Sequence, residues 1–428
     1  MELKELHHLF LKCVSVTTDT RKIEQNTLFF ALKGGNFDAN TFAKEAIEKG
    51  AAYAVIDNKN YFVDERTILV DDVLKTLQDL AKFHRQFLAL PIIALTGSNG
   101  KTTTKELINA VLSAKYRVKA TVGNLNNHIG VPLTLLSFNQ DTEIGIVEMG
   151  ANHQKEIEFL CNLAQPDFGY ITNFGKAHLE GFGGVEGVIK GKSEMYHFLE
   201  QHDKKVFINL DDPIQNQKST RIESYSFSTV QSDADVWITN VKANPFVAVT
   251  FQNVEITSQL VGIYNATNIS AAISIGNYFK IEKSLIKKAI EDYFPTNNRS
   301  QLTKKGTNQL ILDAYNANPS SMKVALTHFL QLPQSPKAAF LGDMFELGTE
   351  SFAEHCAIVT SLENATDVQF YFIGQEFYKT KVELPHLRFY PSFEALKEKW
   401  NGAQFENYSI LIKGSRGMAL ERIVELLP

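Results

Sequence analysis

The sequence predicts an α/β protein of three domains. Short apolar runs, typical of buried strands, alternate with segments of helical periodicity along most of the chain. A chain of 428 residues is also too long for one ordinary hydrophobic core. A glycine-rich turn lies between an apolar run at 91–95 and a helical segment at 103–112. This order of strand, turn and helix is typical of a phosphate-binding loop at the edge of a parallel or mixed sheet.

The composition is that of a soluble globular protein, with 44% hydrophobic and 21% charged residues. The formal net charge of −5 argues against a nucleic-acid partner and against a polybasic membrane surface. Cys13, Cys161 and Cys356 are too widely spaced for a C-x-x-C pair, which favours a reducing compartment. The first five residues do not resemble a signal peptide, and no apolar run approaches the ~20 residues of a membrane helix. We therefore expect a cytoplasmic protein without an integral membrane segment.

Residues 1–90 are expected to form a small N-terminal α/β domain. Strands at 26–32 and 52–56 alternate with helices at 41–49 and about 73–87. Thr20 and Arg21 precede the first strand, and Lys33 follows it. These three side chains belong either to a solvated loop or to a site for a phosphorylated ligand.

Residues 91–297 are expected to form a central domain around the glycine-rich turn. Further strand candidates end in polar or small residues, and a parallel sheet would bring these ends to one edge, where ligands bind. The candidates are 144–150, 168–173 and 206–212. Residues 220–260 alternate between apolar and polar side chains, which indicates a few antiparallel strands.

The α/β alternation continues from residue 298 to the C-terminus, which predicts a third domain. Its strand candidates are 310–313, 338–343, 370–374 and 409–413, and its helices are expected near 320–331, 351–362 and 393–400.

The glycine-rich turn is the strongest candidate for a ligand site. Gly97 and Gly100 allow consecutive backbone N–H groups to point at an anion, Lys101 adds a charge, and the Thr102 hydroxyl can hold Mg²⁺. Leu95 stands where the full G-x-x-x-x-G-K-S/T pattern has its first glycine, so a helix N-terminus with a solvated lysine is the competing interpretation. The expected phosphate contacts are Gly97, Ser98, Asn99, Gly100, Lys101, Thr102 and Thr103.

Other polar side chains follow predicted strands. Glu148 closes one strand and would either face a nucleotide-bound Mg²⁺ or cap the next helix, while His178 lies in a loop after another strand, as a surface residue or a second metal ligand. Lys192 has the pattern of a solvent-facing helix lysine. Three loops can contact polar ligands or can be ordinary turns: the first contains Asn126 and Asn127, the second Asp313, Asn316, Asn318 and Ser320, and the third Lys413 and Arg416.

Taken together, these segments resemble the Mur ligase family, ATP-dependent enzymes that form amide bonds in bacterial cell-wall synthesis. The central segments that carry the resemblance are TGSNGKTTT (96–104), GNLNNHIGVPLT (123–134), EMGAN (148–152), TNFGKAHLEGFG (172–183) and KSE (192–194). The C-terminal segments DAYNANPSSM (313–322), LGDMFELG (341–348) and KGSRGMALE (413–421) resemble the family member that joins D-alanyl-D-alanine to UDP-N-acetylmuramoyl-tripeptide.

The resemblance implies three domains: a UDP-sugar-binding domain (1–90), an ATP-binding domain (91–297) and a Rossmann-like ligase domain (298–428). It implies ATP at the glycine-rich turn, with Asn268, Arg299 and Asp313 at the nucleotide. Two Mg²⁺ ions would be held by Thr102, Glu148, His178 and an N-carbamoylated Lys192. The implied catalytic residues are Lys101, His178 and Lys192.

The resemblance also implies small-molecule substrates, UDP-N-acetylmuramoyl-tripeptide and D-alanyl-D-alanine. We expect a monomeric enzyme. The implied substrate residues are Thr20, Arg21, Lys33, Asn126, Asn127, Asn316, Asn318, Ser320, Lys413 and Arg416. Two positions depart from common family patterns, since Ala39-Asn40 follows Phe37-Asp38 and Tyr264 replaces a histidine. The alternatives are another Mur-type amino acid ligase, a folylpolyglutamate synthase-like enzyme, or a binding protein without catalysis.

Overall fold

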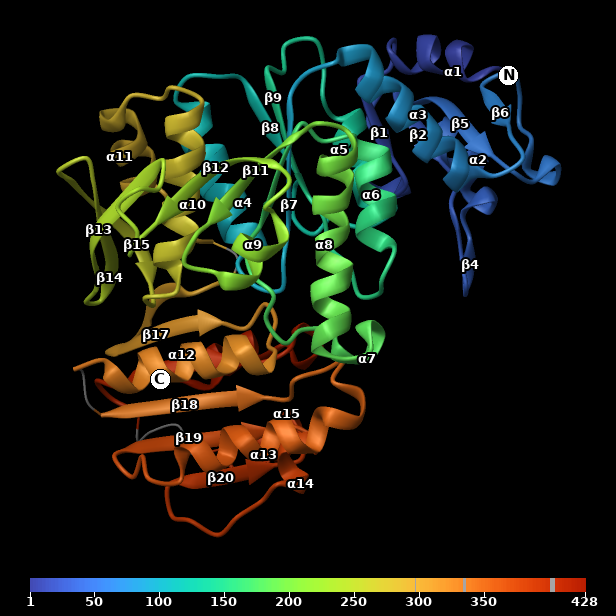
Figure 1. The fold of residues 1–428 in the computed structure, drawn as a ribbon. Coiled ribbons are helices and arrows are strands. Elements are labelled where there is room, and N and C mark those ends of the chain that lie inside the picture. Colours follow the sequence, from blue (N-terminus) through green and yellow to red (C-terminus); the bar gives the residue numbers. More distant parts are fainter. Residues whose placement is uncertain (297, 334–335, 401–404) are drawn as a thin grey trace.

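The computed structural model describes residues 1–296, 298–333, 336–400 and 405–428. Three successive parts of the chain each form their own β-sheet with helices (Figure 1). The predicted α/β fold of three domains is confirmed. The predicted boundary at residue 297 lies outside the described residues.

The N-terminal unit contains a four-stranded parallel sheet in the order β1-β2-β5-β6. The central strand β2 is buried at every position, as expected for the apolar run in 26–32. The strands are β1 (Ser15–Thr17), β2 (Thr27–Phe30), β5 (Ala51–Ile56) and β6 (Thr67–Leu69), with the small hairpin β3 (Lys33–Gly34) and β4 (Phe37–Asp38). The helices are α1 (Leu3–Phe10), α2 (Ala43–Glu48) and α3 (Val73–Leu88).

The central unit contains a nine-stranded sheet in the order β15-β14-β13-β12-β11-β10-β7-β9-β8. Its strands are β7 (Ile92–Thr96), β8 (Val118–Ala120), β9 (Ile144–Glu148), β10 (Phe168–Ile171), β11 (Lys205–Asn209), β12 (Glu223–Ser228), β13 (Val236–Ala243), β14 (Phe246–Phe251) and β15 (Val254–Val261). The antiparallel pairing predicted within 220–260 joins β13, β14 and β15, whereas β12 pairs parallel to β11.

Helices cover both faces of the central sheet (Figure 1). Side chains alternate along β7, so Ile93 and Leu95 pack on one face with α4 and α10, and Ile92 and Ala94 on the other with α5, α6 and α8. The helices are α4 (Lys101–Ser113), α5 (Gly130–Leu136), α6 (Glu156–Ala164), α7 (Leu179–Phe182), α8 (Val185–Gln201), α9 (Pro213–Lys218), α10 (Asn265–Tyr278) and α11 (Lys283–Glu291).

The C-terminal unit contains a six-stranded sheet in the order β16-β17-β21-β18-β19-β20, parallel except for the edge strand β16. Its strands are β16 (Gln301–Lys305), β17 (Asn308–Asp313), β18 (Lys337–Gly342), β19 (Val368–Ile373), β20 (Leu387–Tyr390) and β21 (Ser409–Lys413). Its helices are α12 (Pro319–Gln331), α13 (Ser351–Leu362), α14 (Gln375–Lys379) and α15 (Phe393–Glu398).

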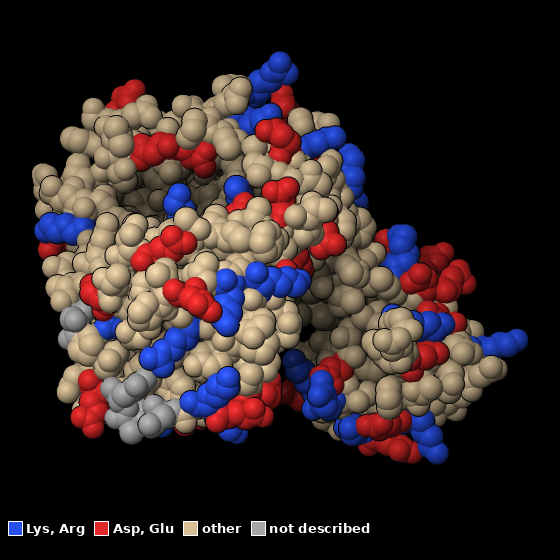
Figure 2. All heavy atoms as spheres, turned by 90° about the horizontal axis from the view of Figure 1, so that it is seen from below, with Lys and Arg blue, Asp and Glu red and all other residues tan. Residues whose placement is uncertain are grey.

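Acidic and basic side chains are interspersed over the face seen in Figure 2 and form no broad field of one sign there. Among the described residues, no helix combines the length and the apolar character needed to cross a membrane.

Candidate active site

A cavity of about 1000 Å³ lies between the central and C-terminal units. Its walls include the loops that follow β7, β8, β9 and β10 in the central sheet, the loop that follows β17 and the end of β21 in the C-terminal sheet, and residues of α6 and α10. Gln78 of α3 is its one lining residue from the N-terminal unit among the described residues. The loops lie at the carboxyl ends of parallel strands, where α/β proteins bind ligands. The predicted polar ends of β9 and β10 therefore meet the C-terminal loops in one place, which no single unit could form alone. The prediction was wrong for the end of β11, because Asp211 accepts from Ser228 and Thr229, Asp212 caps α9, and neither lines the cavity.

The glycine-rich turn is held in a curled conformation by the loop after β10. Gly97 has φ +139°, and a Cβ there would lie 2.0 Å from the Thr172 hydroxyl, so no other residue fits without a shift. The Thr172 hydroxyl donates to Asn99 O at 2.6 Å, and the Ser98 hydroxyl donates to Gly175 O at 2.7 Å. The turn is therefore a preformed cradle at the N-terminus of α4, where backbone N–H groups and the helix dipole favour an anion.

Lys101 is the first residue of α4 and lines the cavity. Its ammonium donates to the backbone oxygen of Gly97 at 2.8 Å. Burial lowers the pKa of Lys101, and the neighbouring Glu148 partly opposes this. Lys101 is half-buried at the cavity wall, where an anion at the turn would compensate its charge.

Glu148 ends β9 at the floor of the cavity and is 1% exposed. Its carboxylate accepts from the Thr102 hydroxyl at 2.9 Å and from the Asn126 side-chain amide at 2.9 Å. Carboxylate and hydroxyl oxygens are ligands that Mg²⁺ prefers, especially beside nucleotide phosphates. In the described part of the chain, no group of three or more His, Cys, Asp or Glu side chains forms a metal site by itself. The donors present fit an ion that completes its shell with phosphate oxygens and water.

The predicted nucleotide residues Asn268 and Arg299 both line the cavity. Asn268 accepts from the Thr104 hydroxyl at 3.0 Å and packs against Gly100, where φ is +80° and a Cβ would come within 2.7 Å. The guanidinium carbon of Arg299 lies 3.6 Å from the ring centroid of Tyr315, and its buried Nε has no hydrogen-bond partner among the described residues. An unsatisfied buried donor beside the glycine-rich turn fits a phosphate-bearing ligand.

Asp313 and Lys413 form a buried ion pair at the C-terminal wall, with 2.6 Å between Lys413 Nζ and Asp313 Oδ2. The backbone N–H of Ser300 also donates to Asp313, and Tyr264 shares a hydrogen bond of 2.6 Å with the Ser300 hydroxyl. Arg416 instead pairs with Glu421 and lies outside the cavity lining. The two basic residues of this loop are therefore separated.

Lys192 is 1% exposed in α8, so the expectation of a solvent-facing lysine is wrong. Its ammonium donates to Ala151 O at 3.3 Å and lies 5.1 Å from the Phe182 ring centroid. Ala151 lines the cavity, so Lys192 lies directly behind its wall. Burial, and next the charge of Lys101, hold the pKa of Lys192 well below its usual value.

The predicted substrate residues fall into two groups. Those in the central and C-terminal loops, except Arg416, line the cavity: Asn126, Asn127, Asn316, Asn318, Ser320 and Lys413. Those in the N-terminal unit lie outside it. Arg21 pairs with Asp19 beside Thr20, and Lys33 Nζ lies 2.7 Å from Asp57 Oδ1.

The loop 172–183 also contacts the C-terminal unit directly. The backbone N–H of Lys176 donates to the Ser320 hydroxyl at 2.9 Å, and Lys176 Nζ lies 2.5 Å from Glu354 Oε1. His178 Nδ1 contacts the carboxylate of Glu346. We did not predict these contacts of Glu346 and Glu354 between the units. The segment LGDMFELG (341–348) contains Glu346, but no feature of the neighbouring sequence indicates that Glu346 contacts His178.

Comparisons with known proteins agree over nearly the whole chain. Family models described as "Mur ligase family, catalytic domain", "Mur ligase middle domain" and "Mur ligase, glutamate ligase domain" match residues 12–85, 95–276 and 298–416. A UDP-N-acetylmuramoyl-tripeptide–D-alanyl-D-alanine ligase of Bacillus subtilis is 38% identical over 96% of this chain and 92% of its own length. The Escherichia coli ligase of the same name is 33% identical over 96% and 93%.

Solved structures are similar in the same way. A MurF crystal structure from Acinetobacter baumannii matches with a TM-score of 0.85 and 28% identity, over 99% of this chain and 98% of the other. MurF from Thermotoga maritima in complex with ADP matches with a TM-score of 0.83 and 25% identity, over 97% of each chain.

Proposed function

This chain belongs to the Mur ligase family, and from that premise we propose that its cavity joins D-alanyl-D-alanine to UDP-N-acetylmuramoyl-tripeptide at the expense of ATP. The product is the UDP-N-acetylmuramoyl-pentapeptide precursor of peptidoglycan. The observation that carries the proposal is the cavity itself, where the glycine-rich turn and Glu148 face the Asn316–Ser320 loop of the C-terminal unit. ATP, the carboxylate that it activates and the attacking amine can therefore meet in one space.

The chemistry that this arrangement suits is activation of a carboxylate. A carboxylate oxygen of the tripeptide attacks the γ-phosphorus of ATP, ADP leaves, and an acyl phosphate forms. The dipeptide amine then attacks the acyl carbon, phosphate leaves from the tetrahedral intermediate, and the amine loses a proton. Two anions must approach each other in the first step, so catalysis depends on positioning and on stabilising charge.

The residues of the central unit supply that charge stabilisation. We assign Lys101 and the backbone N–H groups of 97–103 to the ATP phosphates, with Arg299 beside them. Thr102 and Glu148 would hold Mg²⁺, and His178 would contribute to a second ion. When bound, these ions would neutralise the oxygens of the transferring phosphoryl group.

The remaining residues are assigned to the two ends of the substrate. We assign Asn316, Asn318 and Ser320 to the dipeptide and Asn126 and Asn127 to the tripeptide, and all five line the cavity. Thr20, Arg21 and Lys33 would contact the UDP-sugar in the N-terminal unit. We further propose a monomeric enzyme, and the soluble nucleotide-linked substrates support a cytoplasmic one.

Lys192 is proposed to be N-carbamoylated. The uncharged amine attacks CO₂ and loses a proton to solvent as the carbamate forms, and burial, which lowers the pKa of Lys192, favours the uncharged amine. The carbamate would place an anion behind the Ala151 wall, where the ammonium has a backbone carbonyl as its hydrogen-bond partner.

The decisive experiment measures phosphate release from ATP with Mg²⁺ and UDP-N-acetylmuramoyl-tripeptide, comparing D-alanyl-D-alanine with single amino acids. We expect release only with the dipeptide, together with a pentapeptide product identified by its mass. Release with a single amino acid instead would favour an earlier ligase of the same pathway. Absence of release with every amine would favour a binding protein without catalysis.

A further inference from the structure

One carboxylate of the C-terminal unit reaches across to the central site. Glu346 lies in the loop between β18 and α13, and its carboxylate contacts Nδ1 of His178. A carboxylate only accepts hydrogen bonds, so in the neutral imidazole Nδ1 carries the proton. Because His178 lines the cavity, Nε2 and its lone pair are then left for a cavity ligand.

The backbone on both sides of this contact is in an uncommon conformation. His178 has φ +53° and Glu346 has φ +61°, a region that residues other than glycine occupy only when their surroundings hold them there. The backbone N–H of Glu180 also donates to the carbonyl of Glu346 at 3.3 Å. The two loops therefore hold each other at the point where their side chains meet.

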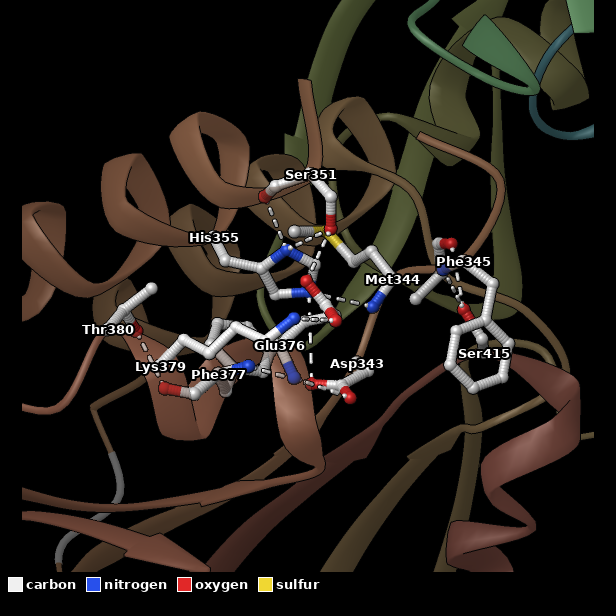
Figure 3. Close-up of polar contacts among 11 residues, drawn as sticks. Asp343, Met344, Phe345, Ser351, His355, Glu376, Phe377, Lys379, Thr380 and Ser415 are labelled. Atoms are coloured by element: carbon white, nitrogen blue, oxygen red, sulfur yellow. Dashed lines mark hydrogen bonds and ion pairs between the residues drawn. The ribbon is translucent and has the colours of Figure 1, made fainter. Parts of the chain in front are cut away.

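The loop that carries Glu346 is anchored from behind by Asp343 (Figure 3). The Asp343 carboxylate, 3% exposed, accepts from the backbone N–H groups of Glu376 and Phe377 at 3.0 and 2.9 Å. Gly374 has φ +126°, and a Cβ there would lie 2.2 Å from the carboxylate. The start of the loop is therefore fixed to the N-terminus of α14.

The next two residues are fixed by side chains as well (Figure 3). The backbone N–H of Met344 donates to Nε2 of the buried His355 at 3.0 Å, while His355 Nδ1 donates to Ser351 O at 2.7 Å. The backbone N–H of Phe345 donates to the Ser415 hydroxyl at 3.0 Å. Asp343 and the two residues after it each form hydrogen bonds to neighbouring elements, so the backbone that leads to Glu346 is held in place.

We propose that Glu346 is a positioning residue of the ligase reaction, which holds the His178 ring in its Nδ1–H form with Nε2 directed at the cavity. The proposal rests on the proposed function. In that function His178 acts at the phosphoryl-transfer site, and partners of a ligating histidine fix both its tautomer and its orientation. The central site is then complete only while the C-terminal unit lies against it.

The alternative is that Glu346 is one of several ties between the two units. The Lys176–Glu354 ion pair offers a matched control, because it links the same loop 172–183 to the same C-terminal unit without touching His178. Glu346→Ala and Glu354→Ala each remove one such carboxylate, and the Glu346 side chain is 51% exposed, so the first variant should fold.

The first measurement reads the ring directly, on the full-length protein without ATP, metal or substrate. Nitrogen-15 NMR of histidine-labelled protein reports which ring nitrogen carries the proton, and the His178 signals are identified by their loss in His178→Gln. We expect Nδ1–H in the wild type and in Glu354→Ala, and a shift towards the Nε2–H form in Glu346→Ala. An unchanged tautomer in Glu346→Ala would overturn the proposal.

The second measurement is a double-mutant cycle in the ligase assay. Glu346→Ala should lower kcat by about 10- to 100-fold with little change in the KM for ATP, whereas Glu354→Ala should change kcat by less than about 3-fold. In a His178→Ala background, Glu346→Ala should cause no further loss. Equal losses in the two carboxylate variants, or additive losses in the cycle, would contradict the proposal. Failure of the proposed function would be separate, since the wild type would then show no dipeptide-dependent turnover while the NMR experiment could still be read.

Discussion

At the scale of single residues, the Thr102 hydroxyl donates a hydrogen bond to Glu148, and Thr102 lines the cavity where the phosphates of ATP would bind. Two substitutions separate the chemical role of the Thr102 hydroxyl from the volume of the side chain. Thr102→Val keeps the volume and removes the hydroxyl, while Thr102→Ser keeps the hydroxyl and removes a methyl group.

We expect Thr102→Val to lower kcat/KM at least about 100-fold, because charge stabilisation at the phosphoryl group is lost. Thr102→Ser should retain most activity. Steady-state phosphate release, with a titration of Mg²⁺ for each variant, measures both. If the two variants were equally impaired, the loss could not be assigned to the hydroxyl alone, and this prediction would be wrong.

The carbamate at Lys192 is also a question about one residue. Lys192→Ala should abolish measurable turnover, and short carboxylic acids such as formate should restore part of it, since they can place an anion in the vacated space. Lys190→Ala on the same helix, an exposed position, should be unaffected and unresponsive to formate. Full activity of Lys192→Ala would contradict the carbamate.

At the scale of elements, the strand–turn–helix unit β7–α4 depends on a glycine that packing requires. Gly97→Ala adds a Cβ that would lie 2.0 Å from the Thr172 hydroxyl, whereas Gly123→Ala introduces a left-handed alanine (φ +57°) into open space. The control should lose only about 1 kcal/mol of unfolding free energy. Gly97→Ala should lose more and should also weaken ATP binding, because the cradle must open to admit the methyl group.

Chemical denaturation and nucleotide-binding calorimetry test this pair of variants. A Gly97→Ala protein with control-like stability and wild-type ATP affinity would show that the turn is more plastic than its contacts indicate.

At the scale of the whole molecule, a pair of buried histidines joins the N-terminal unit to the central one. His84 Nε2 donates to Phe138 O at 2.9 Å, so its Nδ1 accepts from His7 Nε2 at 3.0 Å, and both rings are neutral. Burial, and next the proximity of His84, lower the pKa of His7 from 6.5 to about 4. Between these two values the unfolded chain binds more protons than the folded one at this site, so stability falls as the pH falls.

We expect the unfolding free energy to drop by about 2 kcal/mol between pH 7.5 and pH 5 because of His7 alone. His7→Phe should flatten this slope, since phenylalanine suits the aromatic surroundings of Phe10, Phe83 and Phe87. Urea unfolding at the two pH values measures the difference. An identical slope in wild type and variant would assign the pH dependence to other groups.

The domain organisation and part of the candidate site could be inferred from the sequence without the structure. The alternation of apolar runs and helical segments is a short-range pattern, and it predicted the three α/β units and the β7–α4 turn. Because carboxyl ends of parallel strands share an edge, the same pattern also predicted that Lys101, Thr102 and Glu148 lie close together, and all three line the cavity.

Other features depended on how the units pack against one another. Periodicity placed Lys192 on a solvent face, but packing of α8 buried it, and Arg416 pairs with Glu421 outside the cavity lining. The contact between His178 and Glu346 joins residues 168 positions apart in different units. Local sequence determined the strands, the turns and the chemical groups at their ends. Only the tertiary structure decided which of those groups face one another, because contacts between distant residues follow from the packing of whole elements and carry no signal in the neighbouring residues.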